Sequence, residues 1–431
     1  MLRRRSAPGG AGGSAPALRN AHLFYAEGAA FTLLSALSMS LTNLFLTRLH
    51  ASDYEISTYT MLTQLVGMVF LIPLALFAGR LRSKRGLLCG VLFFIAACFA
   101  AASCAPFLGS SAVAVLVPLA ALGSGSLALY TSVWQAYFAD VIEPDAFNVT
   151  YARRNRVTFV VNLAANLGAG ALLSAIALDS GKVRMHQILY GVAVCCALAE
   201  IVVLLRIRGG DGARQEGKLL PELRRSLREL LQSRSFLGFL GAVGLLYLTW
   251  KLDGTIFYLA QVQYVGLSEF WLSVSTAGNA MGQILTVGLW AKLNEKMGFR
   301  FGLIFGALGL MLSPACIILP FAAHGGARMA LHIVLRFFTD LAFTTIQLNV
   351  LQDLLHAVEE KNRTMAIAVY TTVISLLSAF MPVAGVALYT ALGASEQGMA
   401  RTFAFIGAVR AVTLAVFIAR WLRGRRRAHA A

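Results

Sequence analysis

Charged residues are scarce in this 431-residue sequence, and acidic residues are the scarcest of them. Asp, Glu, Lys and Arg together make up 13% of the chain, whereas hydrophobic residues make up 58%. A soluble protein of this length needs more polar surface to cover its core. Apolar runs of about 18 or more residues recur along the whole chain, each long enough to cross a hydrocarbon layer of about 30 Å as a helix. The composition therefore predicts an all-α, multi-pass membrane protein.

The sequence also lacks the residue patterns of metal, redox and ATP chemistry. Its six cysteines have no metal-ligand spacing and lie within or beside apolar segments, so we expect neither a metal site nor a disulfide framework. No H-E-x-x-H pattern accompanies the seven histidines, and no G-x-x-x-x-G-K-[ST] phosphate loop is present. We expect a protein that is not an enzyme and that binds no metal or cofactor.

Twelve membrane spans are expected, divided into two groups of six by a long polar segment. The expected spans are 24–47, 57–79, 87–107, 112–138, 157–178, 187–206, 236–262, 269–291, 301–322, 329–354, 365–390 and 399–421. These define a disordered tail (1–21), an N-terminal bundle (22–206), a linker (207–235), a C-terminal bundle (236–422) and a basic tail (423–431). Within the linker, Leu219 to Leu231 has apolar residues at helical spacing. This pattern suits either an amphipathic helix on the membrane surface or a solvated linker with some helix.

Basic residues predict the orientation of the spans. Most of the 37 Lys and Arg residues fall in alternate connections, together with the two termini and the linker. Because Lys and Arg are retained on the cytoplasmic side, both termini are expected to be cytoplasmic, in the cell membrane. The net charge of +17 is therefore first a topology signal. Anionic lipid at the linker and basic tails is a second expected partner, whereas nucleic acid is not expected.

An internal repeat relates the two groups of spans. Leu81, Lys84 and Gly86 follow the second span, and Leu293, Lys296 and Gly298 follow the eighth at a constant offset. Asp140 and Asp353, at the ends of the fourth and tenth spans, lie almost the same distance apart. These matches predict two parallel six-span repeats related by an axis along the membrane normal, which is a transporter architecture.

The loops after spans 2 and 8 resemble the G-x-L-a-D-[RK]-x-G-[RK]-[RK] motif of the major facilitator superfamily. We call them the latch loops, with residues Gly79, Ser83, Lys84, Gly86, Glu295, Lys296, Gly298 and Arg300. Ser83 replaces the acid of the first copy, and Trp290 replaces the leading Gly of the second. The resemblance implies twelve helices in two pseudo-two-fold bundles and a latch that holds one access state closed, with Glu295 engaging Arg153, Arg154 or Arg156. The proline of the drug-antiporter motif is missing from span 5, which weakens a drug-efflux assignment.

Charged residues inside spans are costly and are candidate functional groups. In span 10, Arg336 and Asp340 share one helical face, and Asp340 lies about 18 Å below the outer boundary. The pair predicts a substrate or proton site, or else a structural ion pair. In span 7, Lys251 and Asp253 are candidates, and Tyr258 shares the face of Lys251. Lys251 is expected either to face a cavity or to pair with another helix or extend outward. Structural pairing is expected for Arg410, and Glu27 is a further proton-relay candidate.

Uncharged polar residues complete the list of candidate cavity residues. They are Asn43, Tyr130, Trp134, Gln135, Asn162, Asn166, Asn279 and Gln283. Such side chains at four-residue spacing serve equally well to join neighbouring helices, so both interpretations stay open for each of them.

These observations predict a secondary transporter, expected to be monomeric, that moves a small solute by alternating access. Protons are the expected coupling ion, in symport or antiport, with Asp340 as the first candidate and Asp253 or Glu27 as the next. Arg336 and Lys251 favour a solute with a carboxylate or phosphate group. The alternatives are a non-transporting sensor of the same fold and a membrane-embedded enzyme.

Overall fold

Helices form almost all of the chain. The computed structural model describes residues 15–77, 83–209, 219–359 and 362–430, and these residues contain no strand, which confirms the all-α prediction. Ten helical segments within these ranges are long and apolar enough to cross a membrane. Two further helices, α3 (Asp53–Phe77) and α11 (Glu269–Met297), fill the predicted second and eighth spans. At about 1.5 Å per residue they are about 37 and 43 Å long, so the helix order is consistent with twelve spans.

The N-terminal bundle holds the first six spans. It comprises α1 (Ala15–Leu37), η1 (Met39–Leu41), α2 (Thr42–Arg48), α3, α4 (Lys84–Ser103), η3 (Ala105–Ser111), α5 (Ala112–Val141), α6 (Pro144–Ser174) and α7 (Asp179–Arg206). Helix α1 packs against α6 and α7, and α5 packs against α3 and α4. The first span is made of α1, η1 and α2 in succession.

The C-terminal bundle follows a linker helix. Helix α8 (Leu219–Gln232) precedes α9 (Arg234–Lys251), α10 (Gly254–Leu259), η4 (Ala260–Val265), α11, α12 (Phe299–Leu312), α13 (Ala315–Ile318), η5 (Leu319–Ala322), α14 (Gly326–Asp340), α15 (Phe343–Ala357), α16 (Arg363–Ala391) and α17 (Glu396–Ala430). Helix α8 lies where the sequence predicts amphipathic spacing. Its Leu230 packs into the core of this bundle, while Leu227 and Leu231 are exposed.

The terminal helices are longer than the sequence suggests. Helix α1 begins at Ala15, inside the segment expected to be a disordered tail, and α17 continues to Ala430. The helical pattern thus extends beyond the apolar stretch at both termini.

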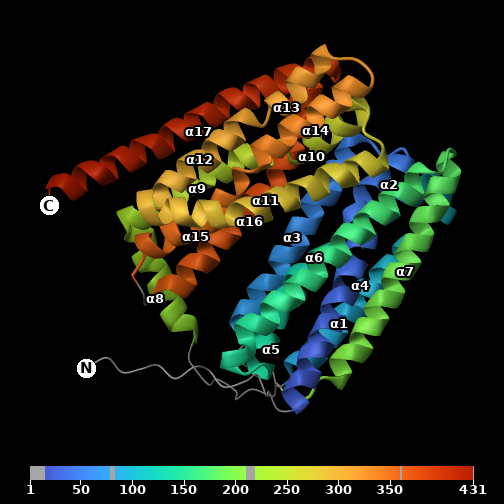
Figure 1. The fold of residues 1–431 in the computed structure, drawn as a ribbon, viewed down its shortest axis with the longest axis horizontal. Helices are drawn as coiled ribbons and strands as arrows, with labels where there is room; N and C mark the ends of the chain where they lie inside the picture. The colour runs from blue at the N-terminus through green and yellow to red at the C-terminus, as the bar shows by residue number, and fades with distance from the viewer. Residues whose placement is uncertain (1–14, 78–82, 210–218, 360–361, 431) are drawn as a thin grey trace.

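The two bundles share a core at only one end of the molecule. We call the helix ends beside the basic loops the basic end and the other ends the opposite end. One apolar cluster joins residues of both bundles, and its C-terminal members, such as Leu259 and Phe403, lie towards the opposite end. A separate cluster, including Phe239 and Leu354, fills the basic end of the C-terminal bundle alone. Figure 1 shows the bundles meeting near α2 and separating towards α5 and α8.

Several spans are interrupted, and two of the breaks lie beside buried charges. Span 7 breaks between α9 and α10 at Asp253, and span 10 breaks between α14 and α15 just after Asp340. A break in a span frees backbone carbonyls that lipid cannot satisfy. Here Trp290 Nε1 donates to the Leu341 carbonyl at 2.9 Å, and Arg410 donates to the Thr249 carbonyl. The breaks thus bring polar side chains into the interior of the C-terminal bundle.

Candidate functional site

A cavity of about 240 Å³ lies within the C-terminal bundle. Six of the predicted candidates line it: Lys251, Asp253, Asn279, Gln283, Arg336 and Asp340, with the aromatic residues Trp250, Phe257 and Phe343 beside them. These residues come from spans 7, 8 and 10, so the fold brings together side chains that the sequence separates by almost ninety positions. The interrupted helices and their polar groups form one concave site.

The stripe on span 10 forms a hydrogen-bonded ion pair in this cavity. Arg336 Nε lies 3.1 Å from Asp340 Oδ2, and Asn279 Nδ2 donates to the same oxygen at 2.8 Å. Gln283 in turn donates to Asn279 Oδ1, and the Arg336 guanidinium lies over the Phe257 ring, 4.8 Å from its centroid. Asp340 is buried, whereas Arg336 is partly accessible. The pair is closed in this state and faces the cavity.

Asp253 is held by a fully buried arginine from the last span. Arg410 Nη2 lies 2.6 Å from Asp253 Oδ2, and the same guanidinium donates to Ser313 Oγ at 2.7 Å and to the Thr249 carbonyl at 3.0 Å. These contacts hold α9 to α12 and α17 at the break in span 7. The structure thus contains the pairing expected for Arg410.

Lys251 differs from the other cavity cations because it has no carboxylate partner. None of the ion pairs found among the described residues includes it, and its Nζ lies 5.0 Å from the Trp250 ring centroid. The two carboxylates nearby, Asp253 and Asp340, are taken by Arg410 and Arg336. Three cations, Lys251, Arg336 and Arg410, thus face two carboxylates, so by formal charge this region of the cavity carries one excess positive charge.

A second buried charged cluster lies in the N-terminal bundle. Arg154 of α6 binds Glu27 of α1 with two hydrogen bonds, Nε to Oε2 at 2.9 Å and Nη2 to Oε1 at 3.0 Å. Tyr130 of α5 contacts Glu27 Oε1 at 3.0 Å and also Oε1 of Glu200 on α7. Trp134 stacks over the guanidinium, with Arg154 Cζ 3.9 Å from its ring centroid. Three predicted candidates, Glu27, Tyr130 and Trp134, thus meet here, together with Glu200, which the sequence did not favour over Glu27 as a candidate.

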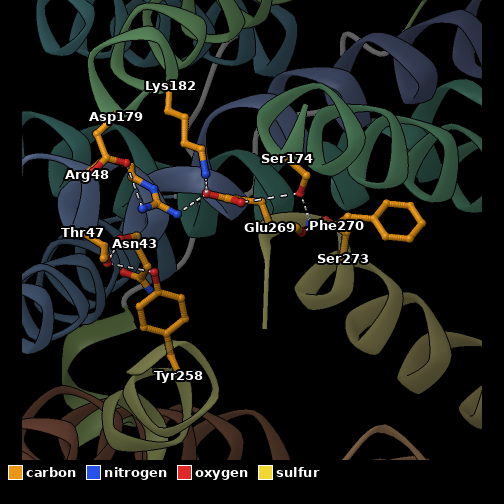
Figure 2. Close-up of polar contacts among 10 residues, drawn as sticks. All are labelled: Asn43, Thr47, Arg48, Ser174, Asp179, Lys182, Tyr258, Glu269, Phe270 and Ser273. Atoms are coloured by element: carbon orange, nitrogen blue, oxygen red, sulfur yellow. Dashed lines mark hydrogen bonds and ion pairs between the residues drawn. The ribbon is translucent and has the colours of Figure 1, made fainter. Parts of the chain in front are cut away.

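The remaining predicted cavity residues lie elsewhere. Asn166 Nδ2 donates to Asn162 Oδ1 at 2.8 Å on the same helix, so these amides satisfy each other. Gln135 is exposed. Tyr258 shares a 2.9 Å hydrogen bond with Thr47 of the N-terminal bundle, beside Asn43 (Figure 2). This last contact joins the two bundles at the opposite end.

The latch loops are engaged within their own bundles. Ser83 caps its own helix by accepting from Gly86 N at 3.1 Å, and Lys84 pairs with Asp140. In the second copy, Arg300 Nε lies 3.5 Å from Asp353, so in each repeat a basic residue of the latch loop pairs with the aspartate at the end of the fourth or tenth span. Gly79 lies outside the described residues.

Glu295 was expected to contact Arg153, Arg154 or Arg156 of span 5. Arg154 instead binds Glu27. Glu295 and Lys296 are exposed, and Gly298 ends α11 with a φ of +83°. The latch predicted at the basic end is therefore open with respect to Arg154, because the bundles are separated there.

A gate that the sequence analysis did not identify closes the opposite end. Glu269, the first residue of α11, binds Arg48 of α2 and, at 2.8 Å, Lys182 of α7. Ser174 Oγ of α6 lies 3.5 Å from the same carboxylate and accepts from Phe270 N at 2.9 Å (Figure 2). We call Arg48, Ser174, Lys182 and Glu269 the opposite-end gate. The sequence did contain a signal for this gate: Arg48 and Lys182 are among the few basic residues in the connections that hold little Lys or Arg.

Close backbone approach supports this gate. A Cβ atom on Gly170 of α6 would lie 2.9 Å from the Glu269 carbonyl and 3.1 Å from Phe270 Cα. Only a residue without a side chain lets α11 come this near α6. The gate is therefore a packed contact between bundles as well as an ionic one.

Comparison with known proteins places the fold. The family model described as "Major Facilitator Superfamily" matches residues 242–431. A mutant of the nucleoside transporter NupG matches with a TM-score of 0.72 and 11% identity, over 93% of this chain and 99% of that one. A bacterial homologue of the iron transporter ferroportin, in an inward-facing state, matches with a TM-score of 0.67 and 13% identity, over 94% and 98%. An auto-inhibited peptide transporter of the POT family matches with 0.65 and 14%, over 95% and 97%.

No curated protein sequence matches the chain. The similar structures carry different cargoes by their own descriptions, and at these identities they show a shared fold. The substrate therefore has to be argued from the residues of this chain.

Proposed function

We propose that the chain is a membrane transporter of the major facilitator superfamily and that it moves a small organic anion by proton-coupled alternating access. The family match in the C-terminal half and transporter folds along the whole chain support transport over a sensor or an enzyme. The anionic substrate and the proton coupling are argued from the cavity.

The excess positive charge at Lys251 is the observation that carries the substrate class. An unpaired charge in a partly desolvated cavity is costly, and a ligand of opposite charge offsets that cost. A carboxylate or phosphate group would pair with Lys251, with Trp250 and Phe257 flanking its apolar part. The cavity of about 240 Å³ has room for several water molecules, which suits a small solute.

The arrangement of the bundles supports an inward-facing state. If the basic end is cytoplasmic, as the distribution of Lys and Arg predicts, the opposite-end gate closes the outer side. Exposure of the solute to the outside then requires Glu269 to leave Arg48 and Lys182. This rocking of two six-span halves about a central site is alternating access.

Proton coupling follows from the pair of Arg336 and Asp340. A solute anion that binds near Lys251 also competes for Arg336, which is partly accessible. Asp340 would then be a buried carboxylate without a cation, which is costly in free energy. Binding a proton removes that cost. Solute and proton would therefore bind together at this cavity.

The test is uptake by purified protein in liposomes. A panel of labelled small carboxylates and phosphate esters, with neutral analogues of each as controls, is offered with and without an inward proton gradient. We expect gradient-driven accumulation of an anion and, in Lys251→Gln, a loss of apparent affinity of about 10- to 100-fold. Lys251→Arg should retain most of the affinity. Accumulation of neutral analogues alone, or full affinity in Lys251→Gln, would refute the substrate assignment.

A further inference from the structure

The charged cluster of the N-terminal bundle contains one carboxyl group more than its cations can neutralise. Glu27 and Glu200 are both fully buried, and Arg154 binds Glu27 alone with its two hydrogen bonds. Among the described residues, Glu200 Oε2 is buried with no hydrogen-bond partner. A second ionised carboxylate in such a place is strongly disfavoured.

Counting hydrogen atoms at Tyr130 shows where a proton must be. The phenol has one hydrogen to donate, yet its oxygen lies within hydrogen-bonding distance of two carboxyl oxygens, one on Glu27 and one on Glu200. One of these two contacts therefore needs a hydrogen that belongs to a carboxyl group. Glu27 already accepts two charge-assisted bonds from Arg154, which favours its ionised form. The arrangement that supplies a hydrogen to each contact places one on Glu200, so that Glu200 donates to Tyr130 and Tyr130 donates to Glu27.

Among the described residues around Glu200, none besides Arg154 offers a compensating charge. Glu27 faces it from α1, Tyr130 from α5, Arg154 from α6 and the Cys89 thiol from α4, with Cys196 on its own helix. Arg85 of α4 donates to the Ile207 carbonyl at 3.0 Å. Arg154 is the only one of these groups that both bears a positive charge and contacts the cluster, and it is used by Glu27.

We propose that Glu200, Tyr130 and Glu27 form a proton-binding site in the N-terminal bundle, with Glu200 carrying the proton while Arg154 holds Glu27. The site is separate from the solute cavity, which lies in the other bundle. Movement of Arg154 away from Glu27 would raise the number of protons the two carboxyl groups bind, and its return would release one through Tyr130. The role of this site in transport rests on the proposed function, whereas proton binding does not.

Infrared spectroscopy of the full-length protein in lipid nanodiscs tests the site without any solute. At about pH 7, we expect the wild type to show a protonated carboxyl band that Glu200→Gln removes. Gln at this position donates an N–H to Tyr130 as the protonated acid does, so folding should be retained, and the thermal unfolding temperature checks this. Glu143→Gln, the same substitution at an exposed residue of the same bundle, should leave the band unchanged.

Two other variants decide between the possible assignments. Tyr130→Phe should keep the band and shift its frequency, because the acceptor of the carboxyl hydrogen is lost. A band that survives in Glu200→Gln and disappears in Glu27→Gln would overturn the assignment, as would the absence of a protonated band in the wild type. The infrared results can be interpreted even if no anion is transported. If an anion is transported, Glu200→Gln should exchange it across the membrane but lose at least tenfold of its gradient-driven accumulation.

Discussion

Whether a buried ion pair can be predicted from the sequence depends on where the partner of each charge lies. Sequence spacing alone predicted the pair of Arg336 and Asp340, because residues four apart on one helix meet regardless of the fold. It could not predict the pair of Arg154 and Glu27, whose partners lie on different helices far apart in the chain. Glu200 was passed over for the same reason, since its significance depends on Tyr130 reaching it from α5.

Asp340 is the cavity carboxylate whose neutralisation we expect to accompany solute binding. Asp340→Asn removes the group that takes up the proton but keeps an oxygen acceptor for Arg336 and Asn279. We predict normal membrane insertion and solute exchange, with loss of proton-driven accumulation. The measurement is accumulation of the labelled anion in liposomes under a proton gradient, and wild-type coupling in this variant would remove Asp340 from the mechanism.

Arg410 is predicted to act on stability. Arg410→Met leaves Asp253 without its cation and several carbonyls without a donor, at an expected cost of about 3–5 kcal/mol. Adding Asp253→Asn should recover part of this loss, because the uncompensated charge disappears. Thermal unfolding in detergent measures both variants, and an equal loss in the single and double variants would show that the carbonyl contacts alone matter.

At the scale of elements, the gate is formed by helix ends that come from both bundles. The periodic apolar runs predicted the spans themselves, since hydrophobic length is a local property. The positions of the breaks at Asp253 and Asp340 were less predictable, because a break is tolerated only where Arg410 or Trp290 can satisfy the freed carbonyls. The gate depends on packing between bundles, which no local pattern reports.

Glu269→Gln is predicted to favour opening of the gate. It removes the charge shared by Arg48 and Lys182, and a partly buried charged contact of this kind is worth about tenfold or more in an equilibrium. Spin labels on exposed positions of α3 and α11 at the opposite end should report a larger population of long distances. Asp179→Asn is the matched control, because Asp179 also pairs with Arg48 but is 54% exposed and should contribute little. Equal effects of the two variants would contradict the role given to Glu269.

For the whole molecule, the repeat in the sequence anticipated two comparable bundles but not their relative position. Both latch loops pair with their own bundle in this state, so the residues that resemble the family motif say nothing by themselves about which end is closed. The position of the shared apolar core indicates that the opposite end is the closed one.

Orientation in the membrane is the corresponding prediction at this scale. Reporter fusions at the two termini should both be cytoplasmic, because the basic loops flank the same helix ends as the termini do. A periplasmic or extracellular terminus would invert the assignment of the gate to the outer side.

Helix α6 runs without interruption from Pro144 to Ser174, whereas several other spans are broken. Arg154 lies about 15 Å from its first residue, and Gly170 and Ser174 lie at its other end, about 24 and 30 Å further along the axis. An unbroken helix transmits tilt and sliding over its full length, so a movement at the opposite end also shifts the backbone beside Glu27. Opening of the opposite-end gate, as in Glu269→Gln, should therefore change the proton affinity of the site at Glu200.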